Sequence, residues 1–217
     1  MRVARSLVVV ALLPLFAACQ LFDGPRESAS HAGQTRMQGQ LTAADGKLLF
    51  QPCNETSSYV VNDTGGTSVL QQAASLADTK GKLFADVRGR IVDSRLDLEQ
   101  LYRVERSGTA CDDPNFKLQI LRAAGHSPEW NVKVSGKGMV VDRAGQPPLA
   151  VPYVEEQLGD GRFNLSTEAN NQHIELWVAP QRCTDSSTGS VQHMSAELRI
   201  NGQVQRGCAY FGGARND

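Results

Sequence analysis

Short apolar segments separated by turn residues run along most of this chain, and this pattern predicts a protein built mainly from β-strands. Asp45-Gly46 and Asn201-Gly202 each stand between two such segments. Asp-Gly and Asn-Gly favour the tight turns that join antiparallel strands, because both positions tolerate a positive φ. We therefore expect a β-hairpin at each of these two sites.

One stretch has the period of a helix. Ser68 and Gln71 have the spacing of an N-terminal capping box. Apolar residues follow at intervals that place them along one side of a helix, and they are Val69, Leu70, Ala73, Leu76 and Ala77. We expect one short helix here, packed on the surrounding strands.

The pattern divides into two β-rich halves at Cys111–Pro114. We expect a mainly-β fold of two small antiparallel barrel or sandwich domains. The first, residues 36–113, carries the short helix, and the second, residues 114–217, is more purely β.

The N-terminal segment has the three-part layout of a secretory signal. Arg2 and Arg5 precede an apolar run, Leu7–Phe16, and small residues then lead to Cys19. A cysteine at this place indicates a lipoprotein signal peptide, residues 1–18, with Cys19 as the lipidated first residue. An ordinary signal peptide cut near Ala18 is the alternative.

Charge and composition limit the partners. Residues 19–35 are polar and rich in Gly, Pro and Ser, which predicts a flexible lipidated tether. Removing residues 1–18 takes away two arginines and no acid, which leaves 20 basic and 23 acidic residues. Nucleic-acid binding has no electrostatic support in such a chain. We expect membrane attachment only through the lipid, and outer-membrane placement because Gln20, not Asp, follows Cys19.

Four cysteines remain once Cys19 is assigned to the lipid: Cys53, Cys111, Cys183 and Cys208. Three connectivities are open in principle. We favour Cys53–Cys111 and Cys183–Cys208 by position, one bond in each half, formed in an oxidising compartment. A thiolate metal site is the alternative, but the chain has no Cys-x-x-Cys and no histidine at ligand spacing.

Two weaker sets of side chains are candidates for binding. Trp130, Trp177 and Tyr153 can line a ligand cavity inside the second barrel, although aromatic residues more often fill such a core.

His173 and Glu175 share one strand face and can reach a common ion. His193-Met194 offers soft ligands suited to copper. Ordinary surface residues are the alternative reading of both pairs.

No catalytic cluster stands out. Gly125–Glu129 approaches the Gly-x-Ser-x-Gly turn of serine hydrolases around Ser127, but Pro128 removes a backbone N–H and Glu129 replaces the glycine. Asp63-Thr64-Gly65 matches the aspartic-protease triplet in a single copy, and a turn explains it. We expect no enzymatic activity and no cofactor.

Five segments together carry a resemblance. They are Phe50–Cys53, Leu83–Gly89, Ala124–Trp130, Cys183–Asp185 and Gly207–Ala209. The chain resembles a family of uncharacterised Gram-negative envelope lipoproteins with a Phe-x-Pro-Cys motif and a C-terminal module that reads Gly-x-Glu-Pro-x-Trp, Cys-x-Asp-Gly-Met-Ser and Gly-Cys-Ala. It departs from that module at Ser127 and at Ser186–Gly189. The resemblance supports pairing Cys183 with Cys208 and implies no catalytic residue.

We expect a lipid-anchored outer-membrane protein, facing the periplasm, that acts as a non-enzymatic binding or envelope-maintenance module. Its partner would be an envelope protein or a small ligand. One alternative is a copper- or metal-binding envelope-stress lipoprotein, whose small barrel the N-terminal half resembles without its Cys-x-x-Cys. A hydrolase using Ser127 is the other.

Overall fold

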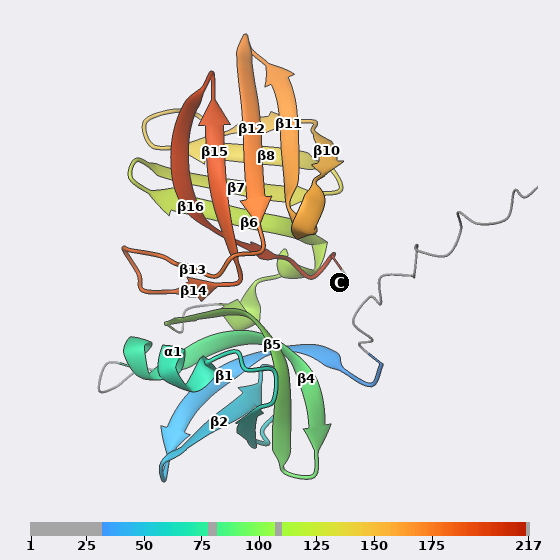
Figure 1. Ribbon diagram of the computed structural model, residues 1–217, viewed down its shortest axis with the longest axis vertical. Helices are drawn as coiled ribbons and strands as arrows, with labels where there is room; N and C mark the ends of the chain where they lie inside the picture. The colour runs from blue at the N-terminus through green and yellow to red at the C-terminus, as the bar shows by residue number, and fades with distance from the viewer. Residues whose placement is uncertain (1–31, 78–81, 107–109, 216–217) are drawn as a thin grey trace, which may run out of the picture. The chain divides into compact units, whose positions relative to one another are not determined.

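Two β-sheets contain all the strands of the described chain (Figure 1). The computed structural model describes residues 32–77, 82–106 and 110–215. Strands account for 60% and helical segments for 9%. The mainly-β fold with barrel-like sheets and one short α-helix is therefore confirmed. The expected signal peptide, Cys19 and most of the tether lie outside the described residues.

The first sheet contains a closed five-stranded barrel. Its last strand pairs in parallel with the third and antiparallel with the fourth, and these two pairings close the ring. Fully buried aliphatic and aromatic side chains fill the interior, among them Leu41, Phe50 and Leu96. The strands are β1 (Thr35–Ala44), β2 (Lys47–Pro52), β3 (Tyr59–Asp63), β4 (Leu83–Val92) and β5 (Arg95–Arg106).

Both predicted hairpin turns are present. Asp45 and Gly46 have φ of 51° and 71° between the paired residues Ala44 and Lys47. Asn201 and Gly202 have φ of 50° and 82° between β15 (Met194–Ile200) and β16 (Gln203–Phe211). Positive φ at both central residues matches the twist of the flanking strands, so local sequence is sufficient to set these two registers.

The helix α1 (Val69–Leu76) forms, but two predicted details are wrong. Ser68 is in the left-handed region at φ 60° and makes no side-chain cap, so the capping box is absent. Leu70 is 48% exposed, whereas Gln72 is buried. The chain enters the helix from a loop in which Asp63 Oδ1 accepts from the backbone N–H of Thr67 at 2.8 Å. Gln72 lies on the same side of the helix as the buried residues Val69, Ala73 and Leu76.

The second sheet is a curled, antiparallel sheet of nine strands. Its concave side holds a separate core around Trp130, Leu176 and Leu198. In spatial order the strands are β10 (Val154–Gln157), β11 (Phe163–Ala169), β12 (Gln172–Ala179), β15 (Met194–Ile200), β16 (Gln203–Phe211), β6 (Gln119–His126), β7 (Glu129–Ser135), β8 (Gly138–Arg143) and β9 (Leu149–Val151). Short 3-10 turns lie at Ala110–Asp112, Phe116–Leu118 and Gly159–Gly161.

A short hairpin from the C-terminal half joins the first sheet. The strands β13 (Cys183–Thr184) and β14 (Val191–Gln192) pair with each other, and β14 pairs with β5 at Val104 and Arg103. The predicted boundary after residue 113 therefore separates the strands of the two sheets except for this hairpin. Residues 114–217 contribute to both.

A buried ion pair ties the two sheets together. Arg36 on β1 donates to both carboxylate oxygens of Asp86, at 2.9 and 2.8 Å. The same guanidinium donates to the carbonyls of Phe211 and Gly212 at 2.6 and 2.9 Å. The Asp86 side chain is 0% exposed. One arginine thus neutralises a buried carboxylate in the barrel and binds the end of β16.

Candidate ligand-binding cleft

Both disulfides that we favour by position are present. Cys53 pairs with Cys111, and Cys183 pairs with Cys208, with Cα–Cα distances of 5.5 and 5.4 Å. The first bond lies wholly within residues 36–113. The second joins β13, a strand of the barrel sheet, to β16 of the nine-stranded sheet. It therefore fixes the hairpin beside the outer surface of the second sheet.

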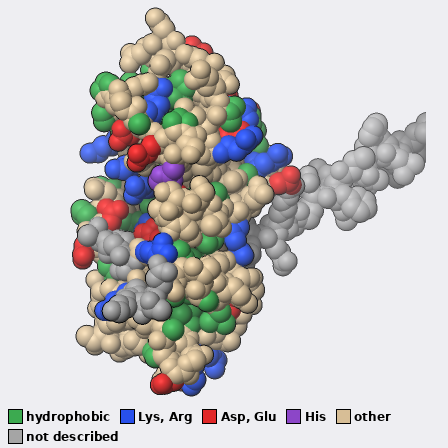
Figure 2. All heavy atoms as spheres, turned by 90° about the vertical axis from the view of Figure 1, so that its left-hand side faces the viewer, with side chains coloured by type: hydrophobic (Ala, Val, Ile, Leu, Met, Phe, Trp, Pro, Cys, Tyr) green, Lys and Arg blue, Asp and Glu red, His purple; other side chains and the backbone are tan. Residues whose placement is uncertain are grey.

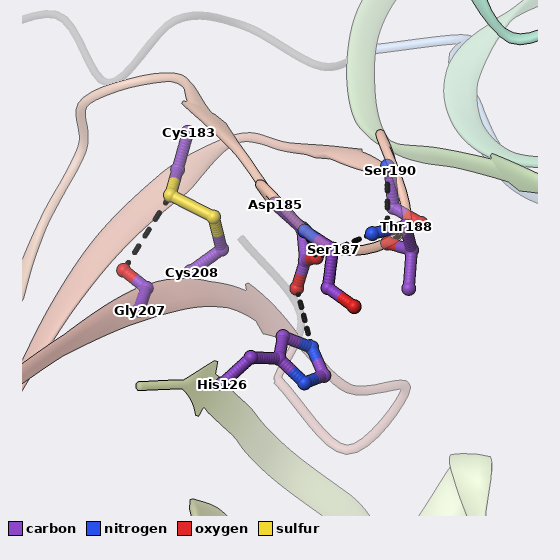
Figure 3. Close-up of a disulfide and its surroundings, with 8 residues drawn as sticks. All are labelled: His126, Cys183, Asp185, Ser187, Thr188, Ser190, Gly207 and Cys208. Atoms are coloured by element: carbon purple, nitrogen blue, oxygen red, sulfur yellow. Dashed lines mark hydrogen bonds and ion pairs between the residues drawn. A yellow bond between two sulfur atoms is a disulfide. The ribbon is translucent and has the colours of Figure 1, made fainter. Parts of the chain in front are cut away.

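The loop that follows β13 is organised by one carboxylate (Figure 3). Asp185 Oδ1 accepts from the backbone N–H groups of Ser187 and Thr188, at 2.9 and 2.8 Å. The Asp185 N–H donates to the Ser190 carbonyl at 2.8 Å. An aspartate that accepts from the N–H groups two and three residues ahead stabilises a tight turn. The second carboxylate oxygen is thereby left facing the neighbouring strand.

That oxygen meets a histidine. His126 Nε2 lies 2.8 Å from Asp185 Oδ2 (Figure 3). The contact requires a proton on Nε2, so a neutral His126 has its Nδ1 lone pair available. Burial raises the pKa of the Asp185 carboxyl. This effect is outweighed by groups that lower the pKa, namely the N–H groups of Thr188 and Ser187, the Thr188 hydroxyl and His126. The net pKa of Asp185 is therefore below its usual value. Asp185 is thus a charged acceptor that orients His126.

The two residues line a cleft of about 370 Å³, called here the His126 cleft. Its floor is the outer side of β6, β15 and β16, where Ala124 and Ser195 are small. One wall is the Cys183–Cys208 bond with the Asp185 loop. The lining is rich in hydroxyl and amide groups, from Gln181, Thr184 and Ser186 among others. Such a surface offers hydrogen bonds of both polarities to a ligand.

Charges at the far side of the cleft are matched. Glu197 accepts from Arg199 Nη2 at 2.8 Å and from Arg206 Nε at 3.3 Å. The hydrogen bond from Arg199 is the main reason that the pKa of Glu197 lies below its usual value. The face seen in Figure 2 likewise intersperses acidic and basic side chains. The cleft therefore has no strong net field to select a highly charged ligand.

The predicted aromatic residues lie in three different settings. Trp130 is 2% exposed and sits in the core beneath the cleft floor, where its Nε1 is 2.4 Å from the position of a Cβ added to Gly125. Tyr153 packs at the margin of the same core. Trp177 is on β12 with the Arg199 guanidinium 4.7 Å from its ring. None of the three lines the His126 cleft.

The predicted metal ligands fall into two separate places. His173 Nε2 lies 3.7 Å from Glu175, and its Nδ1 lies 3.3 Å from Glu168, on an exposed strand face. His193 and Met194 do not converge, because Met194 enters the core of the second sheet while His193 packs against Tyr102. No group of three or more histidine, cysteine, aspartate or glutamate side chains is placed to hold a metal among the described residues.

The pairing of His126 with Asp185 was not predicted. Both residues lie in segments that the sequence singles out, Ala124–Trp130 and Cys183–Asp185, but no motif links these two distant segments. Ser127, the nucleophile candidate, follows His126 directly and is exposed at the β6–β7 turn. No hydrogen bond joins its hydroxyl to a histidine in the part of the chain that the structure describes.

Comparisons with known proteins return nothing: no family model, no curated protein sequence and no solved structure matches this chain. Across residues 32–77, 82–106 and 110–215, no helix has the length and apolar character to cross a membrane.

Proposed function

We propose that this protein is a lipid-anchored, periplasm-facing envelope protein that acts as a non-enzymatic binding module, with its ligand held in the His126 cleft. The observation that carries the proposal is the 2.8 Å contact between His126 and Asp185 at the edge of a 370 Å³ cleft. Binding sites of this size typically place a few fixed polar groups in a concave surface. Here the turn around Asp185 holds one such group in place.

The lining favours a neutral ligand with many hydroxyl and amide groups, of the glycan type. Gln181, Ser186 and Ser195 can each donate and accept. The carboxylates of Asp185 and Glu197 already have partners. A charged ligand would have to compete for those partners, whereas a glycan hydroxyl can bond beside them. His126 Nδ1 supplies an acceptor in a fixed direction.

A direct test is isothermal titration of the oxidised protein with neutral oligosaccharides, using N-acetylglucosamine oligomers and malto-oligosaccharides as probe compounds. We expect binding of one series, weakened at least tenfold by His126→Ala. His173→Ala is the matched control, because His173 is an exposed histidine on the same sheet. Equal affinity in wild type and His126→Ala, or no binding of either series, would count against the proposal.

The anchor is tested separately. Lipidation at Cys19 leaves four cysteines in two disulfides, so detergent-extracted protein should carry a diacylglyceryl mass and no free thiol. Intact mass with and without reduction reads both quantities. Cys19→Ala should abolish the lipid mass and release the protein from the membrane fraction. A mature N-terminus other than Cys19 would contradict the lipoprotein assignment.

A hydrolase is the second candidate, and one observation favours it. An aspartate that accepts from one ring nitrogen of a histidine, while the other nitrogen stays available, resembles the acid–base pair of hydrolytic triads with the two ring nitrogens exchanged, because Asp185 bonds Nε2 here and the triad aspartate bonds Nδ1. In this reading, His126 would activate a serine hydroxyl or a water molecule. Hydrolysis of a probe compound that is lost in both His126→Ala and Asp185→Asn would support an enzyme, and unchanged turnover in Ser127→Ala would exclude Ser127 as nucleophile.

A further inference from the structure

One edge of the nine-stranded sheet is open. Its outermost strand, β10 (Val154–Gln157), pairs only with β11 among the strands of the described chain (Figure 1). All four residues of β10 are exposed, and Val154 is 70% exposed. The pairing has no register shift, and the strand has no proline. An edge of this kind presents backbone groups to which another chain can bind.

The direction of the backbone groups follows from one hydrogen bond. The N–H of Leu158, just after β10, donates to the Arg162 carbonyl at 2.8 Å, in register with the β10–β11 pairs. Hydrogen-bonded and non-hydrogen-bonded pairs alternate along an antiparallel ladder. Glu156 therefore bonds to β11, whereas Glu155 and Gln157 direct their N–H and C=O groups to the open side. No backbone hydrogen bond from another described segment reaches these four groups.

Acidic side chains dominate this side of the sheet. The strands β10, β11 and β12 contain no lysine or arginine and four acidic residues, which are Glu155, Glu156, Glu168 and Glu175. Arg215 lies 3.3 Å from Glu155, and His173 is within 3.7 Å of Glu168 and Glu175. Glu156 forms no ion pair within the residues that the structure describes. The charge at this edge therefore favours a cationic partner over an anionic one.

Two side chains of β10 would meet those of an added strand. Val154 and Glu156 are two residues apart and share one face. Both would form non-hydrogen-bonded pairs with an added antiparallel strand, and in such pairs the Cα atoms are closest, at about 4.5 Å. An apolar residue opposite Val154 and a basic residue opposite Glu156 would complement this face.

We infer that the β10 edge binds an extended, basic polypeptide segment of another protein, which joins the sheet as an added antiparallel strand. Strand addition takes its affinity from main-chain hydrogen bonds and its specificity from alternate side chains. A second copy of this chain fits poorly. Every antiparallel register that pairs three or four residues of two β10 strands places a glutamate directly opposite a glutamate, and like charges in such pairs are destabilising.

The test is an NMR titration of the ¹⁵N-labelled oxidised protein with the capped peptide Thr-Lys-Thr-Val-Thr-Lys-Thr as probe. Its lysines and its valine share one face, so a lysine lies opposite Glu156 when the valine lies opposite Val154. We expect saturable shifts at the backbone amides of Glu155 and Gln157, the two N–H groups on the open side. The peptide with glutamate in place of both lysines should bind at least tenfold more weakly.

Methylated peptides test whether the main chain of the probe takes part. In an antiparallel added strand, threonines lie opposite Glu155 and Gln157 and exchange hydrogen bonds with them. N-methylation of the threonine amides should therefore abolish binding. N-methylation of the lysine and valine amides, whose N–H groups face away from β10, should change the affinity less than threefold.

Two variants of the protein localise the site. Gln157→Pro removes an N–H group from the open side and none from the ladder with β11, and edge strands accept proline at such positions. It should weaken binding of the lysine peptide at least tenfold and leave the unfolding temperature close to that of wild type. Glu156→Lys reverses one exposed charge and should make the protein prefer the glutamate peptide, so it keeps the test valid where Gln157→Pro fails to fold. Glu129→Lys, at an exposed position on β7, is the matched control and should bind as wild type does.

Four results would overturn the inference. One is the absence of saturable shifts with the lysine peptide. Equal binding of both methylated peptides would show that the lysines contact acidic side chains without strand addition. Equal affinity of wild type and Gln157→Pro would place the peptide elsewhere. A dimer of the protein alone that Gln157→Pro dissociates would show that a second copy occupies the edge.

The His126 cleft is independent of this edge, because no residue of β10 lines it. His126→Ala should therefore leave the affinity for the lysine peptide unchanged. Loss of oligosaccharide binding in His126→Ala and loss of peptide binding in Gln157→Pro can then succeed or fail separately.

Discussion

The His126 imidazole and the Asp185 carboxylate meet at 2.8 Å, and this contact joins a strand of the nine-stranded sheet to the hairpin of the barrel sheet. The same hairpin is tied to β16 by the Cys183–Cys208 bond. One covalent bond and one charge-assisted hydrogen bond therefore shape the His126 cleft from two sides.

Asp185→Asn should loosen the loop after β13 without unfolding the protein. The Asn oxygen can still accept from Ser187 and Thr188, but its amide group faces His126 with a donor. We expect a loss of about 1.5–3 kcal/mol in the free energy of unfolding, the range for a hydrogen bond to a charged group. Urea denaturation at pH 7 measures it.

The pH dependence of the same variant has a definite sign. The folded pKa of Asp185 lies below its unfolded value. The ionised Asp185 carboxylate therefore adds to the free energy of unfolding at a pH above its unfolded pKa. This stabilisation is lost as the pH falls through the folded pKa. The stability difference between wild type and Asp185→Asn should shrink in acid, and a constant difference down to pH 2 would contradict the assignment.

Removing the Cys183–Cys208 bond should lower both the stability of the protein and its affinity for a ligand in the His126 cleft. The bond closes a separation of 25 residues, and the loop-closure term for Cys183→Ser/Cys208→Ser is about 3–4 kcal/mol. Ligand affinity at the His126 cleft should fall as well, because β13 loses its attachment to β16.

Cys53→Ser/Cys111→Ser is the matched control for that experiment. This bond closes a separation of 58 residues, for which the same term is about 4 kcal/mol. It lies away from the cleft, so the folded variant should bind as wild type does. Equal loss of affinity in both double variants would show that the cleft depends on global stability alone.

Arg36→Ala should be the most destabilising single change among these. It leaves the fully buried Asp86 carboxylate without its cation and removes the bonds to the Phe211 and Gly212 carbonyls. Breaking a buried ion pair at one partner costs about 3–5 kcal/mol. The double variant Arg36→Leu/Asp86→Leu removes both charges and should recover part of this loss, as measured by chemical denaturation.

His193 predicts a pH-dependent stability. Burial lowers its pKa, the Tyr102 carbonyl opposes the shift and Arg36 adds to it, with a net pKa of about 4. Between the folded pKa and the histidine pKa of 6.5 in the unfolded chain, the unfolded chain binds a proton at this residue and the folded chain does not. Stability should rise by about 3 kcal/mol between pH 4 and pH 6.5 from this residue alone.

His193→Asn tests the assignment, because its amide can donate to the Tyr102 carbonyl and does not titrate. The His193→Asn variant should lack the rise in stability between pH 4 and pH 6.5 that His193 causes, whereas His173→Asn, at an exposed site, should keep it. Parallel stability curves for wild type and His193→Asn would show that His193 does not carry the effect.

Short sequence patterns predicted the hairpin turns and the helix, because these elements depend on residues close together in the chain. Asp45-Gly46 and Asn201-Gly202 needed only the turn preference of their own residues, and the hairpins followed. The apolar period predicted the helix and most of its inner face, because Val69, Ala73 and Leu76 are buried. Gln72 is buried with them, since it lies three residues after Val69 on the same side of the helix, and hydrophobicity alone did not indicate a glutamine there.

The candidate sites were harder to predict because their residues come from distant segments. Trp130 was considered for a cavity lining, and its place beneath the cleft floor depends on how β6 and β16 pack over it. His193 and Met194 are adjacent in sequence, yet His193 lies in the bend between β14 and β15 and packs against Tyr102, whereas Met194 begins β15 and enters the core of the second sheet.

By itself, the sequence determined the mainly-β class, the two glycine turns, the single helix and the favoured pairing of four cysteines, because each depends on short-range backbone preference or on counting. Only the tertiary structure decided that the hairpin Cys183–Gln192 leaves its own half to pair with β5, and hence that Asp185 reaches His126. Long-range strand pairing follows from how two cores close against each other, and no local pattern in the chain encodes that choice.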